Sequence, residues 1–493
     1  MRIATGSAVL VAAAAVLSAV APAAHAVLPP PALSFVPDRG GAGVGAPCGH
    51  SVRCVGPSGA FATIGEAVAA ARSGDTIQVQ AGTYRELVVV RGKTLTLRGG
   101  FAAGFARRSP VAEETVIDAA GEGSAVTLSG AGNSSVDGFT ITRGRATLNE
   151  DRGGGGSGIK VEESGRVSIT RNLIVANDDG TDVRTCDCSV LGGGIGAAGD
   201  PRRSSLVVRG NVIRGNRAHR GGGMAIGLPA VIEGNLVESN AGGSDHGGGL
   251  YLNAPRMTVR RNLIRGNSVG DQAGYGWGGG GIFYGGAGPS PRASFGGNRW
   301  VGNSAPSAGS ALFVDDSAVA TITGDLFHGN ACPETGGAGL YVDGGGDPAR
   351  GSVATLENVT ITGHRCGLQA RGSAIFTEGG SRIAVTNSII TGNGSRSQIY
   401  VCAECGELPL IGPSTIAYSL VGPGAVNVRR GAGMRSGSAG FLRPAGGDFH
   451  LGRLSRGIDA AAPSSSVGLE PRPHGGRRDI GAYGGTREAA RRR

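Results

Sequence analysis

The sequence contains few aromatic residues and almost no lysine, and after residue 26 it has no apolar run long enough to cross a bilayer. Phe, Trp and Tyr make up 4% of the 493 residues, which supplies a conventional globular core poorly, whereas glycine occurs 94 times. Regularly spaced glycines with β-branched residues between them suit a solenoid that turns tightly at every corner. The composition therefore favours a repetitive β architecture over several ordinary domains.

The positive charge lacks the pattern of a nucleic-acid-binding surface. The formal net charge is +10 and comes almost entirely from arginine, because Lys93 and Lys160 are the only lysines. The arginines are scattered apart from a dense run at 491–493, and no basic stripe alternates with aromatic residues. We therefore expect no nucleic-acid partner and interpret the charge as solvated surface.

The first 26 residues have the pattern of a signal peptide. A charged start is followed by an apolar stretch over 8–21 and by the small-x-small sequence Ala24-His25-Ala26. We expect removal of 1–26, a Pro/Gly-rich leader and loop over 27–60, and a secreted or surface location without a transmembrane segment. Eight cysteines in an exported chain indicate disulfide bonds.

The rest of the chain predicts a capped solenoid. Thr63 and Glu66 form a capping-box pattern that opens a short apolar helix ending at Gly74. Between 153 and 393, units recur at intervals of roughly 20–35 residues, each with glycines before an apolar strand and Asn-x-apolar-x-x-Asn at its end. The unit starts are GSGIKV (156–161), GGGIGA (192–197), GGGMAI (221–226), GGGLYL (247–252), GGGIFY (279–284), GSALFV (309–314), GAGLYV (337–342) and GSAIFT (372–377).

Units this short bury their apolar faces only by stacking on one another. We therefore predict an all-β fold, a single right-handed parallel β-helix over 61–395 with a short N-terminal capping helix. An irregular capping section is expected over 396–493.

Three stretches resemble known bacterial proteins. FATIGEAVAAARSGDTIQVQAGTYRE (61–86) with GKTLTLRGGF (92–101) resembles the N-terminal cap and first coils of the pectate-lyase-like superfamily. The unit ends resemble the repeats of polymorphic outer-membrane proteins. GDFHLGRLSRGIDAA…DIGAYGG (447–485) resembles the C-terminal stretch of many secreted bacterial β-helix proteins, with Arg456-Gly457 where Pro-Ala is usual and Gly484 in place of a final Glu. These resemblances imply an architecture and no particular reaction.

Stacking predicts which distant residues become neighbours. Cys332 and Cys366 each lie two residues after an equivalent unit end, so we expect a disulfide between them. Further sequence-local pairs are Cys48 with Cys54 and Cys402 with Cys405, whereas the pairing of Cys186 and Cys188 stays open. A zinc site that combines Cys186 and Cys188 with Cys402 and Cys405 is excluded, because they lie about 30 Å apart by strand spacing.

Two columns of amides are expected to hydrogen-bond along the solenoid axis. The first contains Asn172, Asn211, Asn235, Asn262, Asn298, Asn358 and Asn387, with Asp325 in one coil. The second contains Asn177, Asn216, Asn240, Asn267, Asn303, Asn330 and Asn393.

The strand after each glycine group supplies candidate site residues. If its neighbours point inward, the period of two places an exposed aromatic stripe on five coils, made of Tyr251, Phe283, Phe313, Tyr341 and Phe376. Two residues further on, Asp315, Asp343 and Glu378 form a column of carboxylates. A sugar polymer could stack on the rings while adjacent carboxylates, which resist ionising together, act as general acid and base. The alternative is ordinary Asp-Gly turn chemistry, with the stripe covered by 396–450.

The variable loops form a second candidate face. They bring together His219, His246 and Trp277, which we predict to bind substrate, and an acidic loop with Asp178, Asp179, Asp182 and Asp187. Asp245 and Asp271 extend the set. The acidic residues lack regular ligand spacing, so no metal site is predicted, although Ca²⁺ stays open as a cofactor.

Two functions remain in competition. The first is an exported, monomeric protein that binds an extracellular polysaccharide or cell-surface glycan along the solenoid, with hydrolysis or elimination as its chemistry if it is an enzyme. The second is a non-catalytic, adhesin-like surface protein that uses the rod as a spacer. The exposure of the aromatic stripe discriminates between them.

Overall fold

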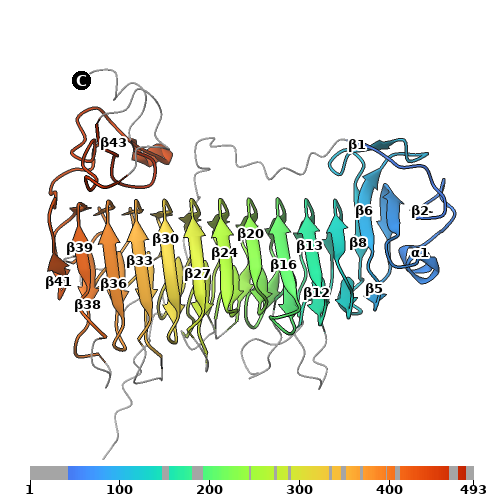
Figure 1. The fold of residues 1–493 in the computed structure, drawn as a ribbon, viewed down its shortest axis with the longest axis horizontal. Coiled ribbons are helices and arrows are strands. Elements are labelled where there is room, and N and C mark those ends of the chain that lie inside the picture. The colour runs from blue at the N-terminus through green and yellow to red at the C-terminus, as the bar shows by residue number, and fades with distance from the viewer. Residues whose placement is uncertain are drawn as a thin grey trace, which may run out of the picture.

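The fold is a right-handed parallel β-helix, seen in a computed structural model as a rod of stacked coils (Figure 1). The structure describes residues 43–146, 155–179, 192–243, 246–270, 275–286, 290–331, 336–345, 351–366, 370–395, 397–405, 411–465 and 476–484. The predicted signal peptide (1–26) lies outside these residues, as do Cys186, Cys188, Cys332, Asp182, Asp187, Asp245 and Asp271.

Three long sheets line the rod, and each coil contributes one strand to each. Sheet A contains β6 (Thr96–Phe101), β10 (Ser134–Asp137), β13 (Arg166–Thr170), β16 (Ser205–Arg209), β20 (Ala230–Glu233), β24 (Arg256–Arg260), β27 (Arg292–Gly296), β30 (Val319–Thr323), β33 (Val353–Glu357), β36 (Arg382–Thr386), β39 (Thr415–Ala417) and β42 (Arg429–Arg430). At its N-terminal end lie β1 (Gly43–Val44), β2 (Val52–Val55), β3 (Thr76–Gln80) and β7 (Arg107–Arg108).

Sheet B contains β4 (Gly82–Tyr84), β8 (Thr115–Asp118), β11 (Thr140–Thr142), β14 (Leu173–Val175), β17 (Val212–Arg214), β21 (Leu236–Glu238), β25 (Leu263–Arg265), β28 (Arg299–Val301), β31 (Leu326–His328), β34 (Thr360–Thr362), β37 (Ile389–Thr391) and β40 (Leu420–Val421). Sheet C contains β5 (Val88–Arg91), β9 (Val126–Ser129), β12 (Ile159–Glu162), β15 (Ile195–Ala198), β19 (Met224–Ile226), β23 (Leu250–Leu252), β26 (Gly281–Tyr284), β29 (Leu312–Asp315), β32 (Leu340–Val342), β35 (Ile375–Thr377), β38 (Ile399–Val401) and β41 (Ala425–Val426). A short extra pair, β18 (Arg217–Ala218) and β22 (Ala241–Gly242), lies beside them.

The core follows from the alternation along each strand. In β13, for example, Val167 and Ile169 are buried inside the rod while the residues between them face outward. Inward side chains of all three sheets form one continuous apolar cluster from Val55 to Val421. The coils therefore extend beyond the predicted limits of 61–395, from β2 at the N-terminal end to β42 at the C-terminal end.

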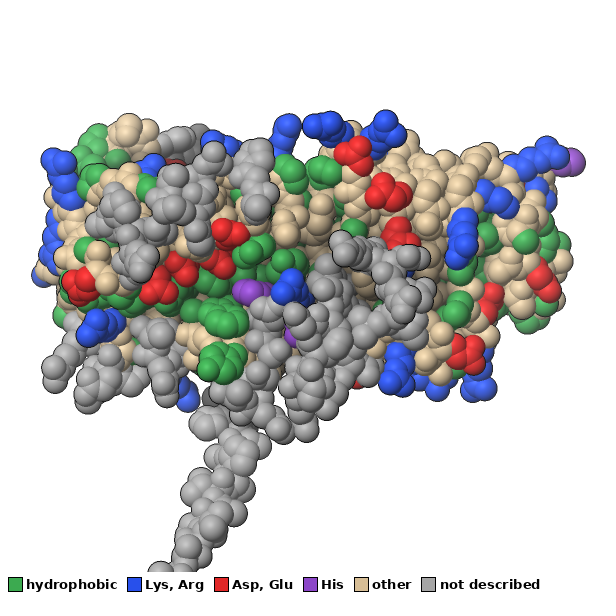
Figure 2. Space-filling model, turned by 90° about the horizontal axis from the view of Figure 1, so that it is seen from below, with side chains coloured by type: hydrophobic (Ala, Val, Ile, Leu, Met, Phe, Trp, Pro, Cys, Tyr) green, Lys and Arg blue, Asp and Glu red, His purple; other side chains and the backbone are tan. Residues whose placement is uncertain are grey.

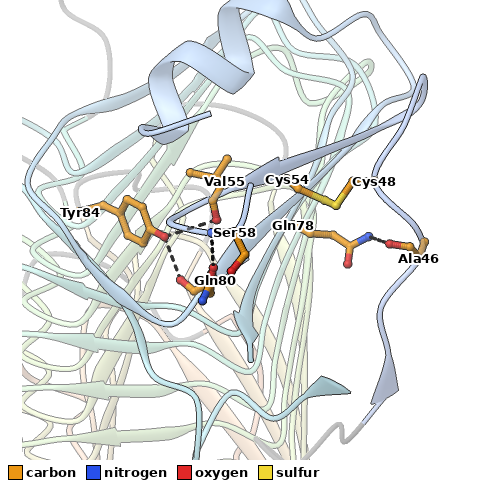
Figure 3. Close-up of a disulfide and its surroundings, with 8 residues drawn as sticks. All are labelled: Ala46, Cys48, Cys54, Val55, Ser58, Gln78, Gln80 and Tyr84. Carbon is orange, nitrogen blue, oxygen red and sulfur yellow. Dashed lines mark hydrogen bonds between the residues drawn. A yellow bond between two sulfur atoms is a disulfide. The ribbon is translucent and has the colours of Figure 1, made fainter. Parts of the chain in front are cut away.

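The N-terminal end carries the predicted helix and disulfide. Helix α1 (Ile64–Ala70) is shorter than predicted, and its capping box is formed, with the Glu66 N–H donating to Thr63 Oγ1 at 3.1 Å. Cys48 and Cys54 form a disulfide beside the first strands (Figure 3). Tyr84 donates to the Gln80 carbonyl at 3.0 Å in the same region.

The two amide columns are present, with one correction. In the second column, for example, Asn240 Nδ2 donates to Ile213 O and to Asn267 Oδ1 at 3.0 and 2.9 Å. It continues through His364, whose Nδ1 accepts from the Asn330 N–H at 3.1 Å. Burial lowers the pKa of His364 to about 3, so the ring is neutral and suits this accepting role.

The prediction that Asn358 and Asn387 belong to the first column is wrong. That column ends at Asp325, and the next coils place Val359 and Ser388 at the equivalent position. Asn358 and Asn387 lie one residue earlier, at a corner with φ of 51° and 53° that Gly297 and Gly324 occupy in the two preceding coils. A one-residue step at a corner turns a side chain from the column toward the outside.

These two asparagines receive the C-terminal section. Asn358 Nδ2 donates to the Asp479 carbonyl at 3.0 Å, and Asn387 Oδ1 accepts from the Ala462 N–H at 2.8 Å. The section contains the hairpin β43 (Phe441–Arg443) and β44 (Asp448–Leu451), joined by the 3-10 turn η1 (Pro444–Gly446). Figure 1 shows it as a lobe beside the last coils, and its described contacts are with the corner between sheets A and B and with side chains of sheet B such as His328 and Ile389.

Candidate functional site

The outward face of sheet C carries a continuous column of large side chains. Backbone register aligns one residue from each of six successive coils, namely Tyr251, Ile282, Phe313, Tyr341, Phe376 and Tyr400. Four of the five predicted stripe residues are therefore aligned. Phe283 is not, and its assignment to the outer face is wrong.

The error at Phe283 has a local cause. Four glycines occupy 278–281, and Gly281 takes the position that Leu250 fills in the preceding coil, which shifts the strand by one residue. Phe283 is consequently fully buried in the core, with its ring 6.3 Å from that of Phe295. A one-residue shift exchanges the two faces of a strand, so Ile282 and Tyr284 take the outer positions.

The aromatic stripe is buried, which corrects the expectation of an exposed platform. Tyr251, Phe313, Tyr341 and Phe376 are only 3–6% exposed. The Tyr341 ring lies 5.3 Å from Phe313 and 5.0 Å from Phe376, so each ring covers its neighbour. Of the predicted cover, 396–450, the described residues Tyr400 and Cys402 pack at the C-terminal end of the stripe, with the Tyr400 ring stacked on Phe376 at 5.6 Å. The lobe that follows makes its described contacts elsewhere, on the side of sheets A and B.

A column of polar groups runs beside this stripe. Tyr284 pairs in register with Asp315, and the N–H of Asp343 donates to Val314 O at 2.9 Å. The N–H of Glu378 donates to Val342 O at 3.0 Å, which continues the same arrangement one coil later. The structure thus places Asp315, Asp343 and Glu378 on consecutive coils, about 5 Å apart along the axis. Figure 2 shows acidic side chains in a row on this face.

Burial determines the protonation of this carboxyl row. Burial, followed by the charge of Asp343, raises the pKa of Asp315 to about 8. Burial also raises the pKa of Asp343 and of Glu378 above their usual range. The Tyr341 hydroxyl donates to Glu378 Oε1 at 2.5 Å, which partly opposes the rise for Glu378. At neutral pH, therefore, Asp315 carries a proton for most of the time.

An aromatic cluster adjoins the N-terminal end of the row. The His246 ring stacks on Trp277 at 5.3 Å and lies 5.9 Å from the ring of Tyr284. Tyr284 also stacks on Tyr251 at 6.2 Å, and the Arg220 guanidinium lies 5.8 Å from the Tyr251 ring centroid. Trp277, Tyr284 and His246 are only partly buried, so this cluster presents ring surface to solvent.

The second candidate face is only partly assembled. His246 and Trp277 join the cluster, but His219 is 4% exposed, and its backbone N–H donates to Asp179 Oδ2 at 2.9 Å. His219 is therefore not presented to a ligand, contrary to expectation. Among the described residues no group of three or more His, Cys, Asp or Glu side chains is arranged to hold a metal ion.

The cysteine predictions have mixed outcomes. Cys402 and Cys405 form a disulfide at the C-terminal end of sheet C. Cys366 is disulfide-bonded, and Ala331 pairs in parallel with Arg365 immediately before the two predicted positions. Cys332 itself lies outside the described residues, so its pairing with Cys366 stays a prediction.

Sequence reasoning missed one site residue because of the register shift. The alternation that was expected to place Phe283 outside would place its neighbour Tyr284 inside the rod, yet Tyr284 lies on the outer face between the aromatic cluster and the carboxyl row. Burial, followed by the charge of Asp316, raises the pKa of Tyr284 to about 12, so its hydroxyl keeps its proton. The fourth glycine of 278–281 is the signal that could have revealed its position.

A comparison with protein-family models agrees with the architecture. Residues 124–347 match the family model described as a right handed beta helix region. No curated protein sequence matches the chain. Among solved structures, a pectate lyase, Pel9A, is 12% identical with a TM-score of 0.42, covering 85% of this chain and 90% of its own. A pectin methylesterase from Aspergillus niger is 14% identical with a TM-score of 0.24, covering 83% and 98%.

TM-scores of 0.42 and 0.24 are too low to support an inference about this chain, so these two structures indicate no activity for it. Within the part of the chain that the structure describes, no helix has both the length and the apolar character needed to span a membrane.

Proposed function

We propose that the outer face of sheet C binds an extracellular polysaccharide and hydrolyses it. The observation that carries the proposal is the pair formed by Asp315, whose pKa is raised to about 8, and Asp343 on the next coil. Such a pair combines a carboxylic acid that can protonate a glycosidic oxygen with a carboxyl group that can accept a proton from water.

The aromatic cluster supplies the binding surface in this proposal. Trp277, His246 and Tyr284 present partly exposed rings at one end of the carboxyl row. Sugar rings stack their apolar faces on such side chains, and the Tyr284 hydroxyl adds a hydrogen-bonding group. A chain bound along the rod axis would extend from these rings over Asp315 and Asp343. Export and a monomeric state remain part of the proposal.

In the proposed chemistry one carboxyl group acts as the general acid and the other as the general base. Asp315 donates its proton to the leaving-group oxygen as the glycosidic bond breaks. Asp343 accepts a proton from the attacking water. Glu378, which accepts a hydrogen bond from the Tyr341 hydroxyl, lies on the next coil and positions further polar groups beside the reacting bond. Removal of either leading carboxyl should therefore reduce turnover more than binding.

The test is a screen of plant, algal and bacterial polysaccharides for reducing-sugar release and for absorbance at ~235 nm, which separates hydrolysis from elimination. Asp315→Asn and Asp343→Asn should each lower the rate by at least about a hundredfold. Asp200→Asn, at a surface turn, is the matched control and should keep full activity. Full activity in both site variants would overturn the assignment.

A second function is favoured by the burial of the stripe. The rings of Tyr251, Phe313, Tyr341 and Phe376 stabilise one another, as expected of a rigid spacer or adhesin-like rod. A protein of this kind would release no product from any polymer, and Asp315→Asn would alter its stability alone.

A further inference from the structure

The C-terminal lobe combines exposed leucines with a concentration of arginine. Leu454 is 85% exposed and Leu442 is 44% exposed, the former being the most exposed large apolar side chain described. The lobe and the end of the rod next to it, 429–456, contain six arginines, at 429, 430, 435, 443, 453 and 456, against a single carboxylate, Asp448; those at 443, 453 and 456 belong to the lobe itself. Isolated exposed leucines are common on proteins, but exposed leucines surrounded by cations indicate a binding surface.

The hairpin explains how the leucines reach the surface. Phe441 pairs with Leu451 in register, and both contribute to the small core of the lobe together with Ile458 and Ile480. Leu442, the next residue, consequently points the other way. A side-chain carbon of Leu442 lies 3.3 Å from the place where Gly452 would carry a Cβ, which puts it near the turn that presents Leu454.

The arginines around these leucines keep most of their charge available. Arg443 is 83% exposed and lies 3.6 Å from Asp448, which His450 also contacts at 2.8 Å. Arg456 donates to the Ser436 carbonyl at 3.1 Å and stays exposed, as does Arg453. This surface is therefore both apolar and positively charged.

We propose that the C-terminal lobe docks the protein onto an anionic lipid surface. Leu442 and Leu454 would enter the headgroup region, and the arginines would lie against the acidic headgroups. Each cation near an anionic membrane contributes about fivefold in affinity, and each buried leucine about tenfold. Neither contribution alone anchors a protein, but together they give reversible binding.

The position of the lobe agrees with this role. It stands beside the last coils at the corner between sheets A and B, whereas the carboxyl row is on sheet C (Figures 1 and 2). Docking through the lobe therefore leaves the face of sheet C free for a polymer. The proposal is independent of the activity, because it uses no residue of the carboxyl row or the aromatic cluster.

Cosedimentation of the intact protein with vesicles tests the proposal. The protein should bind vesicles of equal parts phosphatidylglycerol and phosphatidylcholine, should bind pure phosphatidylcholine far more weakly, and should be released by salt. The double variant Leu442→Ser/Leu454→Ser should bind at least about tenfold more weakly. The triple variant Arg443→Gln/Arg453→Gln/Arg456→Gln should lose about a hundredfold.

The control changes one exposed apolar residue and two exposed arginines on the rod, away from the lobe. Val111, 64% exposed at the N-terminal end, is replaced by Ser together with Arg256→Gln and Arg292→Gln on sheet A, and binding should be unchanged. All changes are at exposed positions, and unfolding midpoints verify that each variant is folded. Equal binding by the leucine variant and the unchanged protein would overturn the proposal, because a polyanion without hydrocarbon would then explain the arginines. Failure to bind anionic vesicles would also overturn it.

Discussion

The replacement of Asp315 by asparagine should remove a loss of folding stability that the unchanged protein suffers as the pH rises. The pKa of Asp315 is about 8 in the folded chain, against 3.8 for the unperturbed group. The folded protein therefore holds a proton that the unfolded chain releases, and folding stability falls as the pH increases between these two values. An asparagine at this position cannot ionise, so the variant lacks this loss.

The magnitude follows from the size of the shift. Each pH unit in this window costs about 1.4 kcal/mol, and the whole window has a ceiling of about 6 kcal/mol. At pH 4 the variant and the unchanged protein should have similar stability. At pH 8 the free energy of unfolding of the variant should exceed that of the unchanged protein by several kcal/mol. The stability of the variant should still fall somewhat with pH, because the pKa values of Asp343 and Glu378 are also raised.

Urea unfolding followed by circular dichroism between pH 4 and pH 9 measures this effect through the midpoint. Asp118→Asn is the control of opposite sign, because the hydrogen bond from Arg143 holds the pKa of Asp118 below its usual value. The stability from Asp118 is present above that usual value and is lost as the pH falls, so its replacement should destabilise the protein at neutral pH. Parallel pH profiles for Asp315→Asn and the unchanged protein would refute the reasoning.

Three further predictions concern single side chains. Asn240→Ala removes the amide at the centre of the second column and leaves buried backbone groups without partners, so the thermal midpoint should drop by an amount equivalent to about 3 kcal/mol or more. In the unchanged protein the Trp300 Nε1–H donates to Asp325 at 2.9 Å. Asp325→Asn places an amide N–H against this donor, so the variant should be less stable by about 1–3 kcal/mol. The double variant with Trp300→Phe should lose less stability than the sum of the two single changes. Tyr341→Phe removes the hydrogen bond that opposes the raised pKa of Glu378, so an NMR titration should show that pKa rise further.

The architecture could be predicted because the repeat encodes it many times over. Asparagine at most unit ends and glycine before each strand define the coils. Stacking follows because a unit is too short to bury its own apolar face. The alignment of Asp315 with Asp343 and Glu378 follows from the same register. These features depend on the spacing of residues along the chain, which can be read directly from the sequence.

The positions that could not be predicted depend on one-residue shifts of strand register and on the burial of side chains by their neighbours. The extra glycine in 278–281 moved Phe283 into the core and Tyr284 to the outer face. A similar step turned Asn358 and Asn387 outward, where they bind a segment about 75–120 residues further along the chain. Burial of the stripe depends on how its rings pack with one another and with neighbours such as Ala308 and Cys402, and alternation along a strand cannot reveal it.

The two ends of the rod are closed by different means. At the N-terminal end, helix α1 packs against the first coils. At the other end, the last strands β41 and β42 have only two residues each, and both residues of β42 are exposed arginines. A free strand edge invites pairing with a second molecule, and short, cationic edges discourage it. Rods with such ends should resist end-to-end polymerisation into fibrils, although the coils inside each rod pair with one another through the same kind of strand edge.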